Sequence, residues 1–171
     1  MADVHPNAVA VLAAARQLGL SIAHAQYPDG TATAQHAADA IGCDVAQIVK
    51  SLVFVLVGSE SVGHGSTGAG ETVLALVSGA NQLDEKRLAA VAGAKRAKRA
   101  DADQVRAATG YPIGGVPPFG LATELRVFAD EALLGHELVW AAAGTPRDVF
   151  SVAPAALATA VGATVATIRR G

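Results

Sequence analysis

The strongest constraint on the fold is a loop rich in glycine and proline at residues 110–120, which read GYPIGGVPPFG. Its eleven residues include four glycines and three prolines, a composition that excludes a regular helix or a central strand. The prolines stiffen the loop, and a ligand can approach the backbone at the glycines because no Cβ stands in the way. Tyr111 and Phe119 are two of only six Phe and Tyr residues in the chain, so we expect the loop to be packed down. Composition alone leaves two interpretations open, a rigid turn beside the core or a ligand-binding loop.

A second informative segment is the apolar run at residues 47–57, QIVKSLVFVLV. Its β-branched residues predict a buried strand over residues 48–57. Lys50 lies at the start of this run, where an ammonium group must either extend to solvent or face a cavity that holds an anionic group. Lys50 is therefore either an ordinary lysine at a strand end or a cation at the rim of a pocket.

A third segment, residues 81–91, follows the strand-like run at residues 72–77. Leu83, Arg87 and Val91 are spaced as on one face of a helix. We therefore expect a strand followed directly by a helix in this part of the chain.

Together the three segments resemble the YbaK family, the aminoacyl-tRNA deacylase domain that is also inserted in or appended to prolyl-tRNA synthetases. The family pattern has a QIVK-type strand entry, an LDxKxLA helix and the loop TGYxxGGVSPFG. These motifs read here, in the same order, as residues 47–50, 83–89 and 109–120. The resemblance covers nearly the whole chain, from about Thr33 to Val165, and three motifs in order make it specific.

Length and composition indicate one compact α+β domain spanning residues 1–171. A chain of 171 residues with 51% hydrophobic and 16% charged residues can bury a sizeable core. No apolar run is long enough to span a membrane, and the N-terminus lacks the pattern of a signal peptide. Cys43 is the one cysteine, which excludes an internal disulfide and fits a reducing cytosol. We therefore expect a cytoplasmic protein that does not bind membranes.

The pattern of apolar residues and helix caps predicts a mixed, largely antiparallel sheet with flanking helices, as the resemblance also implies. The expected helices lie at residues 7–18, 33–40, 101–108, 130–134 and 154–161. The expected strands lie at residues 21–25, 48–57, 72–78, 125–128, 137–142 and 149–152. Residues 58–70 are rich in Gly and Ser, and we expect a flexible loop there.

Several catalytic and cofactor motifs are absent or lack the context that they need. Residues 63–68 match G-x-G-x-x-G, but a strand is expected after them rather than the helix of a dinucleotide site. No G-x-S-x-G elbow is present. Asp44 follows Cys43, and its charge would raise rather than lower the pKa of the thiol, which argues against a nucleophile. The sequence therefore indicates no cofactor.

The histidines do not indicate a metal site. They lie far apart in the sequence, at His5, His24, His36, His64 and His136. His136 and Glu137 begin an HE pair, but Trp140 occupies the position at which a zinc helix needs its second histidine. We expect surface or capping histidines and no metal.

A cluster of cations is the one strong asymmetry of charge in the chain. Its members are Lys86, Arg87, Lys95, Arg96, Lys98, Arg99 and Arg106. The net charge of −2 gives no overall attraction to nucleic acid, so RNA binding would need such a local patch. The cluster is either a solvated surface or a contact surface for the phosphates of tRNA.

The resemblance implies a free-standing trans-editing hydrolase that deacylates mischarged aminoacyl-tRNA without a metal and with help from the substrate's own ribose hydroxyl. In this interpretation Lys50 anchors the terminal nucleotide, and Gly114 and Gly115 bring backbone groups to the scissile ester. The amino acid would be of the alanine, cysteine or proline type, and a tRNA synthetase is a possible partner. The residues implied to bind the substrate are Val116, Pro118, Phe119 and Gly144.

Two departures from the family pattern leave the substrate open. Pro117 stands where many members have serine, and residues 144–147 read GTPR where another common form has Gly-Lys-Arg-Gly. Two other functions also stay open. One is a non-catalytic module that binds an aminoacyl-adenosine or a synthetase, which the lack of a side-chain base near the glycines favours. The other is the hydrolysis of an ester or amide outside tRNA.

Overall fold

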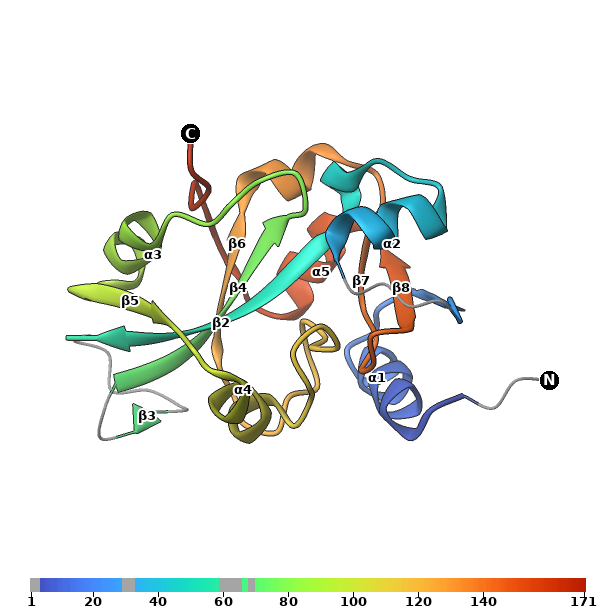
Figure 1. The fold of residues 1–171 in the computed structure, drawn as a ribbon, viewed down its shortest axis with the longest axis horizontal. Coiled ribbons are helices and arrows are strands. Elements are labelled where there is room, and N and C mark those ends of the chain that lie inside the picture. Colours follow the sequence, from blue (N-terminus) through green and yellow to red (C-terminus); the bar gives the residue numbers. More distant parts are fainter. Residues whose placement is uncertain (1–3, 29–32, 59–65, 68–69) are drawn as a thin grey trace.

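The computed structural model describes residues 4–28, 33–58, 66–67 and 70–171. Its longer helices are α1 (Pro6–Gln17), α2 (Ala34–Ile41), α3 (Glu85–Ala92), α4 (Ala102–Thr109) and α5 (Pro154–Ala160), with short 3-10 turns η1 (Val45–Gln47) and η2 (Glu131–Gly135). The strands are β1 (Ala23–Gln26), β2 (Val49–Val57), β3 (Ser66–Thr67), β4 (Gly70–Ser78), β5 (Arg96–Arg99), β6 (Arg126–Asp130), β7 (Val139–Ala142), β8 (Asp148–Val152) and β9 (Thr164–Ala166). The fold is α+β, as the sequence predicts (Figure 1).

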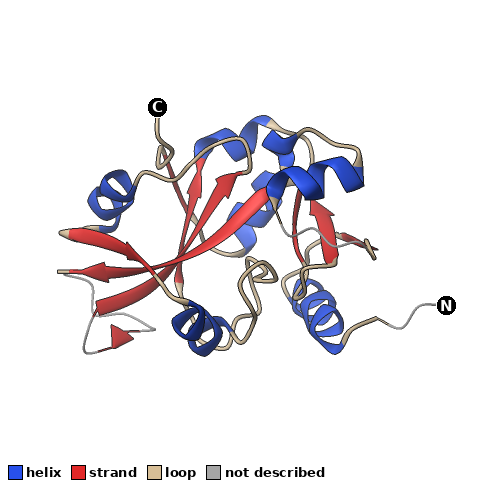
Figure 2. Ribbon diagram, viewed as in Figure 1, coloured by secondary structure: helices blue, strands red, loops and turns tan. Residues whose placement is uncertain are grey.

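The described strands form two sheets. The six-stranded sheet has the order β5-β2-β4-β6-β9, with β3 paired to β4, and the three-stranded sheet has the order β1-β8-β7 (Figure 2). The pairs β4–β6 and β6–β9 are parallel, whereas β2 pairs antiparallel with both β4 and β5. The small sheet is antiparallel throughout. The predicted mixed and largely antiparallel arrangement is therefore confirmed.

The predicted loop at residues 58–70 lies largely outside the described residues, and so does the G-x-G-x-x-G match within it. The strands that it joins, β2 and β4, form the expected antiparallel pair, with Lys50 opposite Val77. Ser66 and Thr67 form the short strand β3 against β4, which the sequence did not predict.

Side chains alternate along β2 between two hydrophobic cores, because successive residues of a strand point to opposite faces. Val49, Val53 and Val55 belong to the core that the large sheet shares with the small sheet, α1 and the glycine-rich loop. Phe54 and Leu56 belong to the core on the other face, which α3 covers. Both faces of β2 are therefore buried along its second half.

Caps read from the sequence fix the ends of several helices. Thr33 caps α2, with its hydroxyl oxygen 3.1 Å from the amide nitrogen of His36. Asp101 and Gln104 form the predicted capping box of α4. Gly110 ends α4 in the left-handed conformation. This cap sets the direction in which the chain enters the glycine-rich loop.

The glycine-rich loop is packed down, as its aromatic residues predict. Tyr111, Val116 and Phe119 are buried, and the Phe119 ring centroid lies 5.4 Å from that of Phe150 on β8. The Tyr111 amide donates to the Thr109 hydroxyl oxygen at 3.1 Å and joins the loop to the end of α4. The loop is therefore a fixed wall between the two sheets.

Within the described part of the chain, no helix has the length and apolarity that crossing a bilayer requires.

Candidate active site

An open stretch of strand edge marks the candidate site. On one side of β2, pairing with β5 ends where Phe54 faces Arg99 and the Ala100 amide donates to the Val53 carbonyl at 3.0 Å. Toward the start of β2, Ile48 forms an isolated parallel bridge with Trp140. Between these two contacts, no described strand pairs with this edge of β2.

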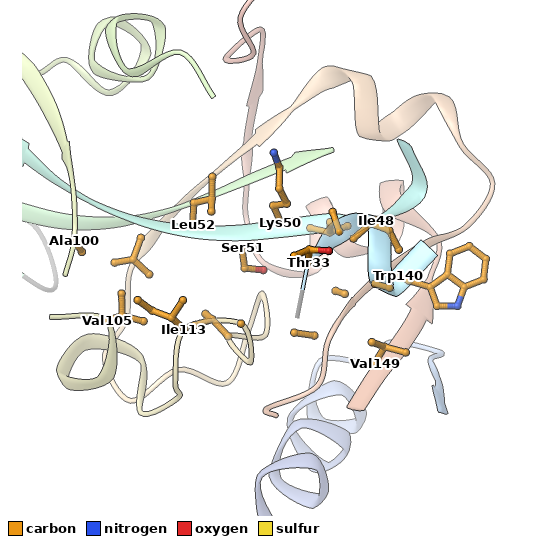
Figure 3. Close-up of a pocket in the computed structure, with 18 of the residues that line it drawn as sticks. Thr33, Ile48, Lys50, Ser51, Leu52, Ala100, Val105, Ile113, Trp140 and Val149 are labelled. Atoms are coloured by element: carbon orange, nitrogen blue, oxygen red, sulfur yellow. The ribbon is translucent and has the colours of Figure 1, made fainter. Parts of the chain in front are cut away.

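A cavity of about 280 Å³ lies along this open edge (Figure 3). Six consecutive residues at the start of β2, from Ile48 to Val53, take part in its lining. The other walls come from α2, the end of β5, α4, the glycine-rich loop, β7 and β8. They are Thr33, Ala34, Ala37, Arg99, Ala100, Val105, Ile113, Gly114, Val116, Trp140, Ala141, Ala142 and Val149. The cavity is therefore mostly apolar, with cations at Lys50 and Arg99.

The backbone of β2 turns polar groups toward the open edge. The carbonyl of Val53 faces β5, whereas the carbonyl of Ile48 faces the other side and accepts from the Gly79 amide at 2.7 Å. Backbone groups alternate in direction along a strand. The amide and carbonyl of Ser51 therefore point toward the gap between β5 and β7.

Lys50 lies at the cavity but is held on the opposite side of β2 from Ser51 (Figure 3). Its ammonium group donates to the backbone carbonyl of Asn81. Burial lowers the pKa of Lys50, and the nearby Arg99 cation lowers it further. The sequence suggested that the ammonium extends to solvent or faces the cavity. The structure shows it hydrogen-bonded to a backbone carbonyl just after the end of β4.

A tight turn shapes the glycines of the loop. The Gly115 amide donates to the Pro112 carbonyl at 2.9 Å, so this N–H is engaged within the turn. Gly114 adopts a left-handed conformation with φ of +88° and lines the cavity. Gly115 does not have a positive φ, and an added Cβ there would lie 3.0 Å from the Gly144 carbonyl. Gly114 therefore faces the cavity, whereas Gly115 packs against Gly144.

Three of the four predicted substrate-binding residues line one of two cavities, whereas Gly144 lines neither. Val116 lines the cavity together with Lys50 and Gly114. Pro118 and Phe119 line a second cavity of about 340 Å³, between α1, the glycine-rich loop and α5. Both are buried, as is the neighbouring Pro117. The roles assigned to all of these residues stay predictions.

The basic residues predicted to bind tRNA are exposed on α3, on β5 and between them. They are Lys86, Arg87, Lys95, Arg96, Lys98 and Arg99. Arg87 is partly engaged, because its guanidinium donates to the Arg169 carbonyl at 3.0 Å. Arg99 lies at the end of β5 and also lines the cavity. The basic surface therefore reaches the candidate site at Arg99.

Among the described residues, neither a histidine nor Cys43 belongs to the lining of this cavity. The His24 ring nitrogen is 2.7 Å from a carboxylate oxygen of the buried Asp148. Burial is the main cause that raises the pKa of the Cys43 thiol, and Asp44 raises it as expected. Among the described residues, no group of three or more His, Cys, Asp or Glu is placed to hold a metal ion. His64 lies outside those residues.

Sequence reasoning missed Ser51 and gave Arg99 only one role. The Ser51 hydroxyl oxygen is buried and has no hydrogen-bond partner in the described structure. Its position next to Lys50 on a predicted strand was the available signal, because it places the two side chains on opposite faces. Arg99 was grouped with the RNA-binding cations, since nothing in the sequence shows that β5 ends at the cavity.

The fold and the cavity together define a small α+β domain with a ligand-sized cavity at a strand edge. The model of the aminoacyl-tRNA editing domain family matches residues 28–160. The chain therefore belongs to this family, which confirms the resemblance found in the sequence.

Known proteins give further similarities. The crystal structure of a candidate trans-editing enzyme for prolyl tRNA synthetase has a TM-score of 0.84 at 40% identity, covering 99% of this chain and 100% of that one. The proline–tRNA ligase of Nitratidesulfovibrio vulgaris is 36% identical over 106 residues, which are 62% of this chain and 16% of the ligase. EbsC of Enterococcus faecalis, a candidate Cys-tRNA(Pro)/Cys-tRNA(Cys) deacylase, is 28% identical over 73% of this chain and 70% of its own length.

Proposed function

We propose that the protein is a trans-editing hydrolase that deacylates mischarged aminoacyl-tRNA in the cytoplasm. The observation that carries this proposal is the apolar cavity at the open edge of β2, bounded by Gly114 and Val116 and flanked by the cations Lys50 and Arg99. Membership of the editing family and the similarity to a candidate trans-editing enzyme support the same activity. The ester would carry a small amino acid, of the alanine, cysteine or proline type.

The proposed reaction is a simple hydrolysis. Water attacks the carbonyl carbon of the ester, the bond from this carbon to the ribose oxygen breaks, and that oxygen takes up a proton as the free amino acid leaves. The neighbouring ribose hydroxyl orients the water. Within the Pro112–Gly115 turn, the Gly115 amide donates the turn's own hydrogen bond, so we assign the stabilisation of the oxyanion to the Gly114 amide. This chemistry needs no metal or cofactor.

The cations would capture the RNA part of the substrate. Lys50 and Arg99 line the cavity and are the residues that we assign to the terminal nucleotide, and the other cations of α3 and β5 are exposed. Contacts between lysine or arginine and phosphates supply most of the affinity of such interfaces. The sequence similarity to a proline–tRNA ligase supports a synthetase as a possible partner.

Editing explains why such a small apolar cavity would be useful. A synthetase site discriminates poorly between amino acids that differ by one methylene group, by about 1–3 kcal/mol. A second site that admits only small side chains can remove the products of these errors. The walls built from Val116, Ala100 and Ala141 suit this role.

One observation favours a second function. None of the described residues that line the cavity is an Asp, Glu, His or Cys that could act as a general base. A module that binds an aminoacyl-adenosine or a synthetase without catalysis would need no base. Substrate-assisted hydrolysis also needs none, so the distinction has to be made by experiment.

The test is a panel of tRNAs, each charged with a different amino acid and assayed for release of the free amino acid. Release from one or a few small-residue esters is the expected result. Tight binding without release would support the binding module. Release from simple esters without tRNA preference would support a hydrolase whose substrate is an ester or amide outside tRNA. The reactions are repeated with chelator on prefolded tRNA. Loss of activity that stoichiometric divalent ion restores would contradict the metal-independent mechanism.

A further inference from the structure

The Ser51 hydroxyl is a polar group of the cavity that the proposed hydrolysis does not use. Its oxygen is buried and has no hydrogen-bond partner, a state that costs free energy because the group has lost water without replacing it. Two other polar groups of the lining, on Thr33 and Lys50, are engaged. The Thr33 hydroxyl oxygen accepts from the His36 amide at 3.1 Å, and the Lys50 ammonium donates to the Asn81 carbonyl.

The surroundings of Ser51 restrict what can bind it. Its side chain lies on the side of β2 that faces Val105 and Ile113 (Figure 3), away from the Lys50 ammonium. An α-ammonium group placed there would bring three donors and a full charge to one neutral oxygen, and burying it would be costly. A single neutral hydroxyl is the group that one serine hydroxyl can satisfy, as either donor or acceptor.

The hydroxyl can reach the cavity without a change of the backbone. The oxygen is shielded, but Ser51 as a whole is only partly buried and lines the cavity. A serine side chain has three staggered χ1 positions. Rotation about this single bond is the movement that would bring the oxygen from the wall into the cavity, and the proposal requires no other.

We propose that Ser51 determines specificity by hydrogen-bonding the side-chain hydroxyl of a β-hydroxy amino acid, with serine as the smallest such substrate. This inference rests on the proposed function, since it names the amino acid that the deacylation site selects. A site built to bond a substrate hydroxyl discriminates strongly against the analogue that lacks it, because the protein group is then left unpaired. Seryl esters should therefore be preferred over alanyl esters.

The test uses the full chain with seryl and alanyl esters on the same tRNA, which differ by one hydroxyl. Ser51→Thr and Ser51→Val form a matched pair, because they have nearly the same shape and only threonine keeps the hydroxyl. Ser51→Ala adds a variant that cannot overfill the cavity, and thermal unfolding checks that all three fold. The measured quantity is the ratio of kcat/KM for the seryl ester to that for the alanyl ester.

The wild type and Ser51→Thr should favour the seryl ester, and the ratio should fall about tenfold in Ser51→Val and Ser51→Ala. An unchanged ratio in these two variants would overturn the inference. So would an equal loss on both esters, which would place the contact on the ester or the ribose. If no ester is hydrolysed, the proposed function fails, and calorimetry with the non-hydrolysable seryl and alanyl amides of 3′-amino-3′-deoxyadenosine decides the inference. If the ratio of Kd for the seryl amide to Kd for the alanyl amide is the same in the wild type and in Ser51→Val, the inference is overturned.

Discussion

Gly115 is the residue at which one added methyl group should disturb the site most. A Cβ there would lie 3.0 Å from the carbonyl carbon and oxygen of Gly144 and from the Thr145 Cα. Because these neighbours are backbone atoms, the turn beside the cavity has to shift. Small displacements of positioning groups cost about a hundredfold in rate, so we expect Gly115→Ala to lower kcat/KM by at least about tenfold.

Gly135→Ala is the matched control, since a Cβ at Gly135 would meet no atom within 4 Å. It should leave both deacylation and tRNA affinity unchanged. Gly115→Ala should also leave tRNA affinity nearly unchanged, because the phosphate contacts lie elsewhere. Normal cleavage by a folded Gly115→Ala variant would show that the contact with Gly144 does not shape the site.

The titration of Lys50 should be visible in ligand binding. Burial and, to a lesser extent, Arg99 lower its pKa from the ordinary value of 10.5. In the proposed role Lys50 would hold a phosphate only while it is protonated, so affinity should fall as the pH rises through this lowered pKa. Lys50→Arg, whose guanidinium stays charged, should keep its affinity to higher pH. The measurement is the Kd of adenosine monophosphate against pH, and identical curves for the two proteins would contradict the assignment.

The residues of the site differ in how well the sequence could predict them. Lys50 stands out as a cation in an apolar run, and Gly114 stands out in a loop that cannot be regular. Ser51 gives no such signal, because its isolation is a property of the fold, namely the early end of β5 pairing. The contact between Gly115 and Gly144 also joins distant parts of the chain, and one sequence does not reveal it.

At the scale of elements, β5 is both a strand that the sequence analysis missed and the main carrier of the basic surface. Its sequence RAKR has one buried residue, Ala97, so no apolar pattern identifies it as a strand. The strands β2 and β4 were predicted well because both faces are buried along much of their length and each contains a long apolar run. The short strand β9 was missed because only the parallel pairing with β6 defines it.

Charge reversal on β5 should separate tRNA capture from hydrolysis. Arg96 is exposed and does not line the cavity, whereas Arg99 does, so Arg96 is the cleaner position. Arg96→Glu should weaken tRNA binding and reduce the slope of log K against log salt by about one unit, because one phosphate contact is lost. Cleavage of a short aminoacyl-adenosine should be unchanged.

Arg16→Glu on α1 makes the same change of charge at another exposed position. This variant should bind tRNA nearly as well as the wild type. Equal effects of the two substitutions would mean that only net charge matters. The basic surface on α3 and β5 would then not be the tRNA contact.

At the scale of the whole molecule, Asp130 ties the C-terminal segment to the large sheet. Its buried carboxylate accepts from the amides of Ala132, Ile168 and Arg169 at 2.9–3.1 Å. Asp130→Ala would leave the buried Ile168 amide and the two partly buried amides unpaired, and we expect it to lower the free energy of unfolding by about 2 kcal/mol. Urea unfolding with an unchanged m-value measures this loss.

The neighbouring Glu131 is the control for Asp130. It contacts the Thr167 hydroxyl and lies near the Arg169 guanidinium, but its side chain is 53% exposed. Glu131→Ala should therefore change stability by less than about 1 kcal/mol. A similar loss for both variants would mean that the buried carboxylate has no special part in holding the C-terminal segment.

The central claim is that the cavity beside Lys50 hydrolyses aminoacyl-tRNA. It is tested most directly by the rate at which free amino acid is released from mischarged tRNA by the wild type and by Lys50→Ala. The loss of a charge-assisted contact to phosphate costs about 1.5–3 kcal/mol, so kcat/KM should fall about tenfold to a hundredfold in a variant that still folds. Release at the wild-type rate by a folded Lys50→Ala protein would place the site elsewhere, and no release from any ester by the wild type would contradict the account itself.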